Sequence, residues 1–183
     1  MGDRFRRATL DDADELLGVI LRAYEPIRRL GIKFPAATAD LAMIRDNIAS
    51  HECCVLEKDG AIVATVTVSE TPEPLKEITD LPFIMKFAVE PAYKGQGHGA
   101  RLLTWVEESV VRDTWKAPAV TLGTALRHPW LVPMYERRGY ERIYEVETED
   151  DGTMVLMRKH LLTPQTTPRA AGRTDAERWR ESG

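Results

Sequence analysis

One short stretch of the sequence alternates glycine with other residues, Lys94-Gly95-Gln96-Gly97-His98-Gly99. An apolar run precedes it, and apolar residues at helical spacing follow it, namely Leu102, Leu103, Val106 and Val110. Glycines at the start of a helix leave consecutive backbone N–H groups unshielded, and the helix dipole adds partial positive charge there. The stretch therefore predicts a strand, a tight turn and a helix whose first turn binds an anion such as a phosphate.

The composition sets bounds on the fold and on the partners. With 183 residues, 43% of them hydrophobic, the chain can bury one sizeable core, so we expect a single domain over residues 1–162. Residues 163–183 contain few apolar side chains and are expected to form a disordered tail. The net charge of -4 provides no basic field for nucleic acid or acidic lipid, so we expect small-molecule partners.

The cysteines and the hydropathy pattern give no sign of export, of a membrane span or of a metal. A disulfide between the adjacent Cys53 and Cys54 would be badly strained, and the pair completes no metal-ligand spacing. We therefore expect two reduced thiols and no metal site. Neither a signal peptide nor a run of about 18 apolar residues is found, so a cytoplasmic protein is the default expectation.

The order of the expected elements indicates the fold class. Ahead of the glycine stretch we expect a strand at 4–8, a helix from Thr9 to about 26–31, a helix starting at Thr38 or Asp40, and a hairpin of strands 53–57 and 61–69. Behind it we expect a helix to about 113, a strand at 119–123, a helix between His128 and Gly139, and strands at 140–147 and 153–160. Paired strands mixed with single crossover helices favour an α+β fold with a mixed sheet.

The run at 83–89 is apolar on both faces of a strand. Strict alternation places Ile84 and Ala88 on one face and Phe83, Met85, Phe87 and Val89 on the other. A strand that is apolar on both faces lies in the middle of a sheet. We therefore expect this run to be the central strand.

From the residues alone, other interpretations compete with a phosphate-binding turn. The stretch matches the dinucleotide pattern G-x-G-x-x-A, but residues 90–94 separate it from the strand, and the next strand ends without a carboxylate. A Walker-type phosphate loop is excluded because no Gly-Lys-Ser/Thr ending follows. A glycine-rich turn without a ligand remains open.

A second motif, C-terminal to the glycine stretch, favours one of these interpretations. The strand ends in Val89-Glu90-Pro91, the glycine stretch follows, and the later segment reads Met134-Tyr135-Glu136-Arg137-Arg138-Gly139-Tyr140. This combination resembles the GCN5-related N-acetyltransferase (GNAT) superfamily, whose phosphate loop is written Arg/Gln-x-x-Gly-x-Gly/Ala. The resemblance covers about residues 4–162 in layout. It implies a three-layer α+β fold with a mostly antiparallel central sheet flanked by helices, and an acetyl-CoA-dependent N-acetyltransferase.

The resemblance also implies which residues bind acetyl-CoA. The pantetheine arm would add like a short strand to the backbone of Phe87, Ala88 and Val89. The pyrophosphate would lie on the loop, with charge from Lys94 or Arg101 and with the binding residues Gly95, Gln96, Gly97, His98, Gly99 and Ala100. His128 occupies a position where the family often has an asparagine that contacts the CoA arm; otherwise it caps a helix.

The resemblance points to one catalytic tyrosine and leaves the base open. Tyr135 aligns with the family tyrosine whose phenol protonates the leaving CoA thiolate, although a core tyrosine is the alternative. Phe83 and Gly123 occupy the positions where family members carry a glutamate base. Glu77, in the acidic segment 70–80, is therefore the remaining candidate for the base, and the other possibility is that bulk water removes the proton.

The acceptor amine is not identified by the sequence. In this family the first two helices, their loop and the segment before the central strand hold it, which here contain Tyr24, Arg28, Arg29, Phe34 and the acidic segment 70–80. The acidic segment suits a cationic amine, whereas the arginines suit a carboxylate or phosphate. A small-molecule N-acetyltransferase is the first hypothesis, and a protein or peptide N-acetyltransferase and a non-catalytic acyl-CoA sensor are the alternatives. The family often forms homodimers, and the oligomeric state stays open.

Overall fold

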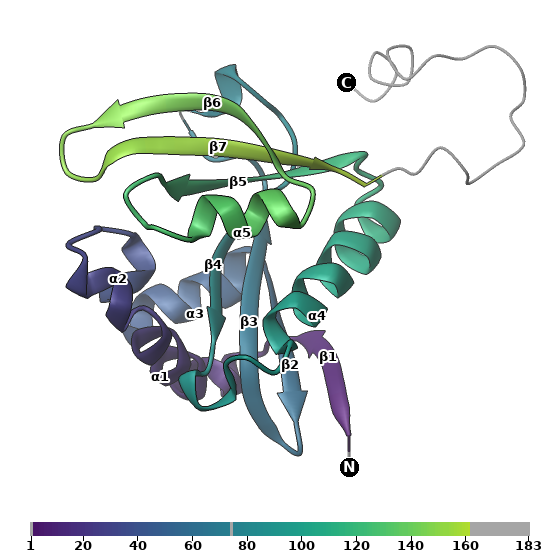
Figure 1. Ribbon diagram of the computed structural model, residues 1–183. Coiled ribbons are helices and arrows are strands. Elements are labelled where there is room, and N and C mark those ends of the chain that lie inside the picture. Colours follow the sequence, from purple (N-terminus) through teal and green to yellow (C-terminus); the bar gives the residue numbers. More distant parts are fainter. Residues whose placement is uncertain (1, 74, 162–183) are drawn as a thin grey trace, which may run out of the picture.

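The computed structural model describes residues 2–73 and 75–161, and its centre is a seven-stranded sheet (Figure 1). The strands follow the order β1-β2-β3-β4-β5-β7-β6, and only the β4–β5 pair is parallel. Their bounds are β1 (Asp3–Arg7), β2 (Glu52–Lys58), β3 (Ala61–Ser69), β4 (Phe83–Val89), β5 (Ala119–Ala125), β6 (Glu141–Thr148) and β7 (Gly152–His160). The α+β class, the mostly antiparallel sheet and the central position of 83–89 are confirmed. The tail expected at 163–183 lies outside the described residues.

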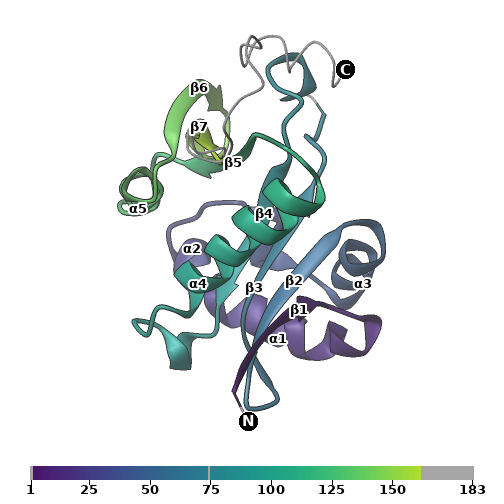
Figure 2. The same cartoon turned by 90° about the vertical axis from the view of Figure 1, so that its right-hand side faces the viewer.

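Helices cover both faces of this sheet. They are α1 (Ala13–Ala23), α2 (Glu25–Arg29), α3 (Leu41–Ser50), α4 (His98–Trp105) and α5 (Leu131–Arg137). Short 3-10 turns occur at Leu10–Asp12, Pro35–Thr38, Leu75–Glu77 and Pro91–Tyr93. Buried residues of α1 and α3 pack with Cys53 and Val55, whereas those of α4 pack with Cys54 and Leu56, so the two groups of helices lie on opposite faces (Figure 2). None of the helices in the described part of the chain could cross a membrane.

Local signals place several of these elements where the sequence predicted them. The Asp40 carboxylate accepts a hydrogen bond of 2.9 Å from the Met43 N–H and caps α3. Asp59 and Gly60 both have positive φ, 50° and 84°, as the two-residue turn of the β2–β3 hairpin requires. The first expected helix is broken at Tyr24, where α1 ends and the short α2 begins.

Strand β4 contains a bulge at Lys86 that the alternation pattern did not reveal. Ile84 and Val89 lie opposite Val68 and Ala64 of β3, whereas Met85 and Ala88 lie opposite Thr67 and Thr65. Directly opposed residues share a face, so the expected faces are wrong: Ile84 shares a face with Val89, and Met85 shares one with Ala88. One extra residue, Lys86 with φ 54°, shifts the alternation by one position.

Helix α4 continues as a π-helix over Val106–Thr114 instead of remaining α-helical to about 113. The wider π turn brings the adjacent residues Val106 and Glu107, and then Val110 and Val111, to the buried side. Glu107 is 2% exposed, and its carboxylate accepts hydrogen bonds from Arg138 at 3.0 Å, Lys159 at 2.9 Å and the Tyr140 hydroxyl at 2.6 Å. This buried carboxylate therefore ties the helix to β7 and to the end of α5.

Replacing Glu107 with alanine should lower the free energy of unfolding by about 3–5 kcal/mol, because two cations and a buried hydroxyl lose their common acceptor. Chemical denaturation measures the loss. Glu108→Ala is the matched control, since Glu108 is exposed on the same turn, and should change stability by less than about 0.5 kcal/mol. Equal effects of the two substitutions would contradict the structural role of Glu107.

Candidate functional site

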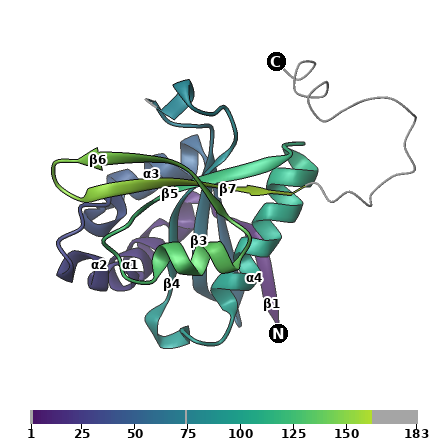
Figure 3. The same cartoon turned by 45° about the horizontal axis from the view of Figure 1, so that its top comes forward.

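The site lies where β4 and β5 separate. These parallel strands pair only at Phe83 with Thr121 and at Ile84 with Leu122. Beyond Ile84, β3 is the only strand paired with β4 in the described part of the chain, so the other edge of β4 keeps free backbone groups. Strands β5, β6 and β7 turn away from β2, β3 and β4 at this point (Figure 3). A cavity of about 730 Å³ opens between the two parts of the sheet.

The glycine stretch forms the turn between β4 and α4 at one end of this cavity. Gly95 and Gly97 have φ of 77° and 81°, and Gly97 is the N-cap of α4. No atom lies within 4 Å of the place where a Cβ would stand on either residue, so both face open space. A Cβ on Gly99 would lie 2.7 Å from Val89 Cγ2 and 2.8 Å from Phe87 Cζ, so this glycine lets α4 pack directly on β4.

The structure brings most of the expected site residues to the cavity. Those that line it are Phe87, Ala88, Val89, Lys94, Gly95, Gly97, His98, Gly99, Ala100, His128 and Tyr135. Gln96 lies outside the lining, and its amide oxygen contacts the His98 ring at 3.3 Å. Arg101 also lies outside, because its guanidinium bonds Asp3 at 2.6 Å and covers the Phe5 ring. Glu77 is exposed and does not line the cavity.

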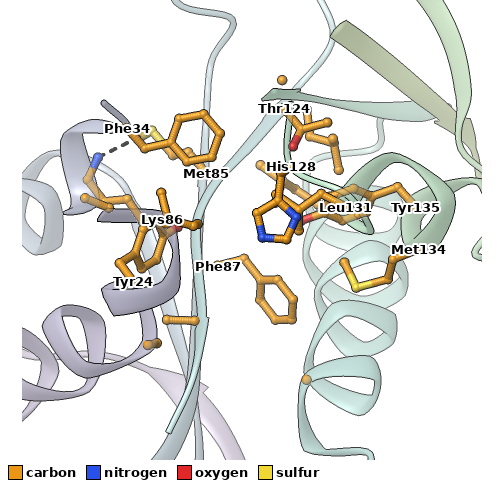
Figure 4. A pocket seen from close by; sticks show the side chains of 18 of the residues that line it. Tyr24, Phe34, Met85, Lys86, Phe87, Thr124, His128, Leu131, Met134 and Tyr135 are labelled. Atoms are coloured by element: carbon orange, nitrogen blue, oxygen red, sulfur yellow. Dashed lines mark hydrogen bonds between the residues drawn. The ribbon is translucent and has the colours of Figure 1, made fainter. Parts of the chain in front are cut away.

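Two buried tyrosines stand on opposite walls of the cavity. Tyr24 follows α1, and Tyr135 lies on α5 (Figure 4). Burial raises the pKa of both phenols, so each keeps its proton at neutral pH. Tyr140 packs edge-on against the Tyr135 ring at 5.6 Å, and its own hydroxyl bonds Glu107. The Glu107 cluster thus supports the wall that carries Tyr135.

His128 and Thr124 extend that wall from the end of β5 (Figure 4). Burial, followed by the charge of Lys94, lowers the pKa of His128, so the ring is neutral at pH 7. The Trp130 N–H donates to His128 Nδ1 at 3.4 Å, which leaves the ring proton on Nε2 as a donor. The Thr124 hydroxyl is buried and finds no hydrogen-bond partner within the described ranges.

These features fit acetyl-CoA as a bound substrate. The free edge of β4 offers N–H and C=O groups to an extended amide-containing arm. The open Gly95–Gly97 turn at the N-terminus of α4 offers amides to phosphates, and Lys94 lines the cavity beside it. The unpartnered Thr124 hydroxyl requires a polar group that the described residues do not supply.

The charged side chains that line the cavity are not those that the sequence analysis named for the acceptor side. Lys86 and Lys94 are the only Lys, Arg, Asp or Glu residues among the described lining residues. Tyr24 and Phe34 line it, but the acidic segment 70–80 contributes only Leu75. Arg28 and Arg29 lie outside the lining as well. Sequence reasoning missed Lys86, although it is the one charged residue within the apolar run 83–89 and could have been noticed for that reason.

Across residues 2–73 and 75–161, no three His, Cys, Asp or Glu side chains come together as a metal site would require. Cys53 and Cys54 are buried free thiols, and burial raises the pKa of both. Neither thiol lines the cavity.

The sequence of this chain is similar to one protein family and to two named enzymes. A family model described as "Acetyltransferase (GNAT) family" matches residues 19–140. An S-alkylcysteine N-acetyltransferase of Bacillus subtilis (strain 168) is 48% identical over 176 residues, covering 93% of this chain and 96% of the relative. An S-(2-succino)cysteine N-acetyltransferase of the same strain is 47% identical over 165 residues, covering 88% and 98%.

Solved structures agree in fold. A GNAT-family acetyltransferase from Streptococcus agalactiae 2603 superimposes with a TM-score of 0.73 at 17% identity, covering 89% of this chain and 98% of the other. The alanine N-acetyltransferase of ribosomal protein S18 from Escherichia coli gives a TM-score of 0.68 at 14% identity, covering 91% and 99%. The sequence matches and the shared fold lead to one conclusion: the chain belongs to the acetyltransferase (GNAT) family and is an N-acetyltransferase.

Proposed function

We propose that this enzyme transfers the acetyl group of acetyl-CoA to the α-amino group of a cysteine whose sulfur carries an apolar substituent. The observation that carries the proposal is the lining of the cavity, which, among the residues that the structure describes, combines apolar walls with two lysines and no carboxylate. Such a cavity disfavours a polycationic amine and accommodates an amino acid with an apolar side chain. The two curated relatives, which are named for acetylating S-substituted cysteines, support the same substrate class.

The proposed reaction is direct transfer in a ternary complex. The acceptor amine attacks the thioester carbonyl, and a backbone N–H of β4 near Val89 stabilises the oxyanion. The carbon–sulfur bond then breaks, the buried phenol of Tyr135 gives its proton to the departing thiolate, and the extra proton on the nitrogen of the adduct returns through water to the Tyr135 phenolate, which leaves the neutral amide and CoA thiol. Glu77 is exposed and away from the lining, so we propose that the ammonium proton of the acceptor leaves to water before attack.

A substrate panel tests this function by following thiol release from acetyl-CoA. S-methylcysteine and S-propylcysteine should be acetylated with kcat/KM at least ~10-fold above that for S-(2-succino)cysteine, because two further carboxylates would enter a mostly apolar cavity. Spermidine and a peptide with N-terminal alanine should give no turnover above background. Acetylation of the peptide alone would support a protein N-acetyltransferase, and binding of acetyl-CoA without any turnover would support a sensor.

Tyr135→Phe should lower kcat by about 10²-fold or more at unchanged KM for acetyl-CoA, because the thiolate then leaves without a positioned acid. Tyr140→Phe is the matched control: its ring contacts Tyr135, yet its hydroxyl bonds Glu107 and it does not line the cavity. That variant should lose stability and keep its kcat. Full activity of Tyr135→Phe would remove the proposed acid.

Gly97→Val should raise the Kd for acetyl-CoA by at least ~10-fold, because a branched side chain would stand in the open space at the start of α4. Gly60→Val is the control, since Gly60 has a similar φ of 84°, is also open, and lies in the β2–β3 turn. Both variants share the backbone strain, but only Gly97→Val should weaken binding in isothermal titration calorimetry. Equal Kd values in the two variants would show that the turn does not hold the phosphates.

A further inference from the structure

Lys86 is a half-buried cation without a carboxylate partner in the described part of the chain. Within the described ranges its ammonium donates a weak hydrogen bond to the Met85 thioether sulfur at 3.6 Å. The Asp46 carboxylate on α3 makes no ion pair with the Lys86 ammonium, although its charge raises the pKa of that ammonium. Burial lowers the pKa of Lys86 and outweighs the opposing effects of Cys53 and Asp46. An ammonium in such a position favours an anion from outside the protein.

The backbone at Lys86 is strained in a way that directs this side chain. Lys86 is the bulge residue of β4, and its φ of 54° lies in the left-handed region that L-residues with side chains rarely adopt. Bulges next to active sites re-aim side chains. The bulge places Lys86 in the lining of the cavity instead of in the alternation of the sheet.

The surroundings of Lys86 belong to the acceptor side of the cavity. Figure 4 shows it beside Tyr24, Phe34 and Met85, on the wall opposite His128 and Tyr135. Lys94 lies in the glycine turn, where the phosphates of acetyl-CoA would require its charge. The two lysines of the lining therefore serve different ends of the cavity.

The arginines that the sequence suggested for an anion are already engaged. Arg28 donates to the carbonyl oxygens of Ala37 at 2.7 Å and Leu21 at 2.6 Å. Arg29 is exposed and bonds Glu25 at 2.7 Å. Lys86 is thus the cation left for the acceptor among the described residues that line the cavity.

We propose that Lys86 binds the α-carboxylate of the acceptor amino acid and thereby selects α-amino acids over simple amines. This inference rests on the proposed function, since it assumes an amino acid acceptor. The carboxylate and the reacting amine of such an acceptor are attached to the same carbon. Holding the carboxylate at β4 therefore keeps the amine near the strand edge where the thioester is expected, and the apolar substituent packs against Tyr24 and Phe34.

The test compares S-methylcysteine with S-methylcysteinamide, which lacks the carboxylate charge, on the wild-type enzyme and on Lys86→Met. In the wild type, kcat/KM should be ~10- to 100-fold higher for the acid than for the amide, as expected for one charge-assisted hydrogen-bonded pair. Lys86→Met should bring this ratio to about 1, mainly by raising KM for the acid. Its KM for acetyl-CoA should stay within ~2-fold, and Lys86→Arg should recover much of the ratio.

Arg29→Met is the control, because it removes a cation near the same end of the molecule that does not line the cavity; its acid-to-amide ratio should equal that of the wild type. A wild-type ratio near 1, or an unchanged ratio in Lys86→Met with normal turnover, would overturn the role of Lys86 and leave the proposed function standing. Failure of the wild type to acetylate any S-substituted cysteine would instead overturn the proposed function, and this inference with it. If Lys86→Met does not fold, the wild-type comparison and Lys86→Gln decide the question.

Discussion

The separation of β4 from β5 is the constraint on which the rest of the site depends. Two parallel strands in the middle of a sheet would normally continue their pairing, but here it ends after Ile84 and Leu122. The bulge at Lys86 rotates the remainder of β4, and the lack of a side chain on Gly99 lets α4 press against that remainder. The result is a strand edge with free hydrogen-bonding groups inside the protein. Such an edge is tolerated where a ligand of extended shape completes the sheet.

The sequence contained enough information for the architecture and for the glycine turn between β4 and α4. The Asp-Gly turn, the Asp40 cap and the apolar run of β4 are local signals, because each depends on residues a few positions apart. The glycine turn is of the same kind, since left-handed backbone and the start of a helix are both determined by neighbouring residues. Local chemistry therefore predicted the order of elements and the place of the glycine turn.

The residues of the acceptor side could not be predicted from local sequence signals, because tertiary packing brings them together. The same limit applies to Arg101 on the donor side, because it lies within the predicted motif, yet its guanidinium bonds Asp3, 98 residues earlier in the sequence. The face pattern of β4 failed because a single bulge residue reverses alternation, and Lys86 has no local feature of a bulge such as glycine. The acidic segment 70–80 was a candidate for the acceptor side only because of its charge, and its carboxylates lie outside the cavity lining.

The two walls of the cavity come from separate parts of the chain. Tyr24, Ile27 and Phe34 precede the sheet hairpin, whereas the glycine turn, His128 and Tyr135 follow β4. Substitutions in the first segment can alter the shape of one wall while the residues of the opposite wall keep their positions. Lineages carrying this architecture can therefore reshape one wall by drift in the seven described lining positions between Ala23 and Ala36, and a library confined to that segment would explore new amines without changing the residues proposed for the transfer chemistry.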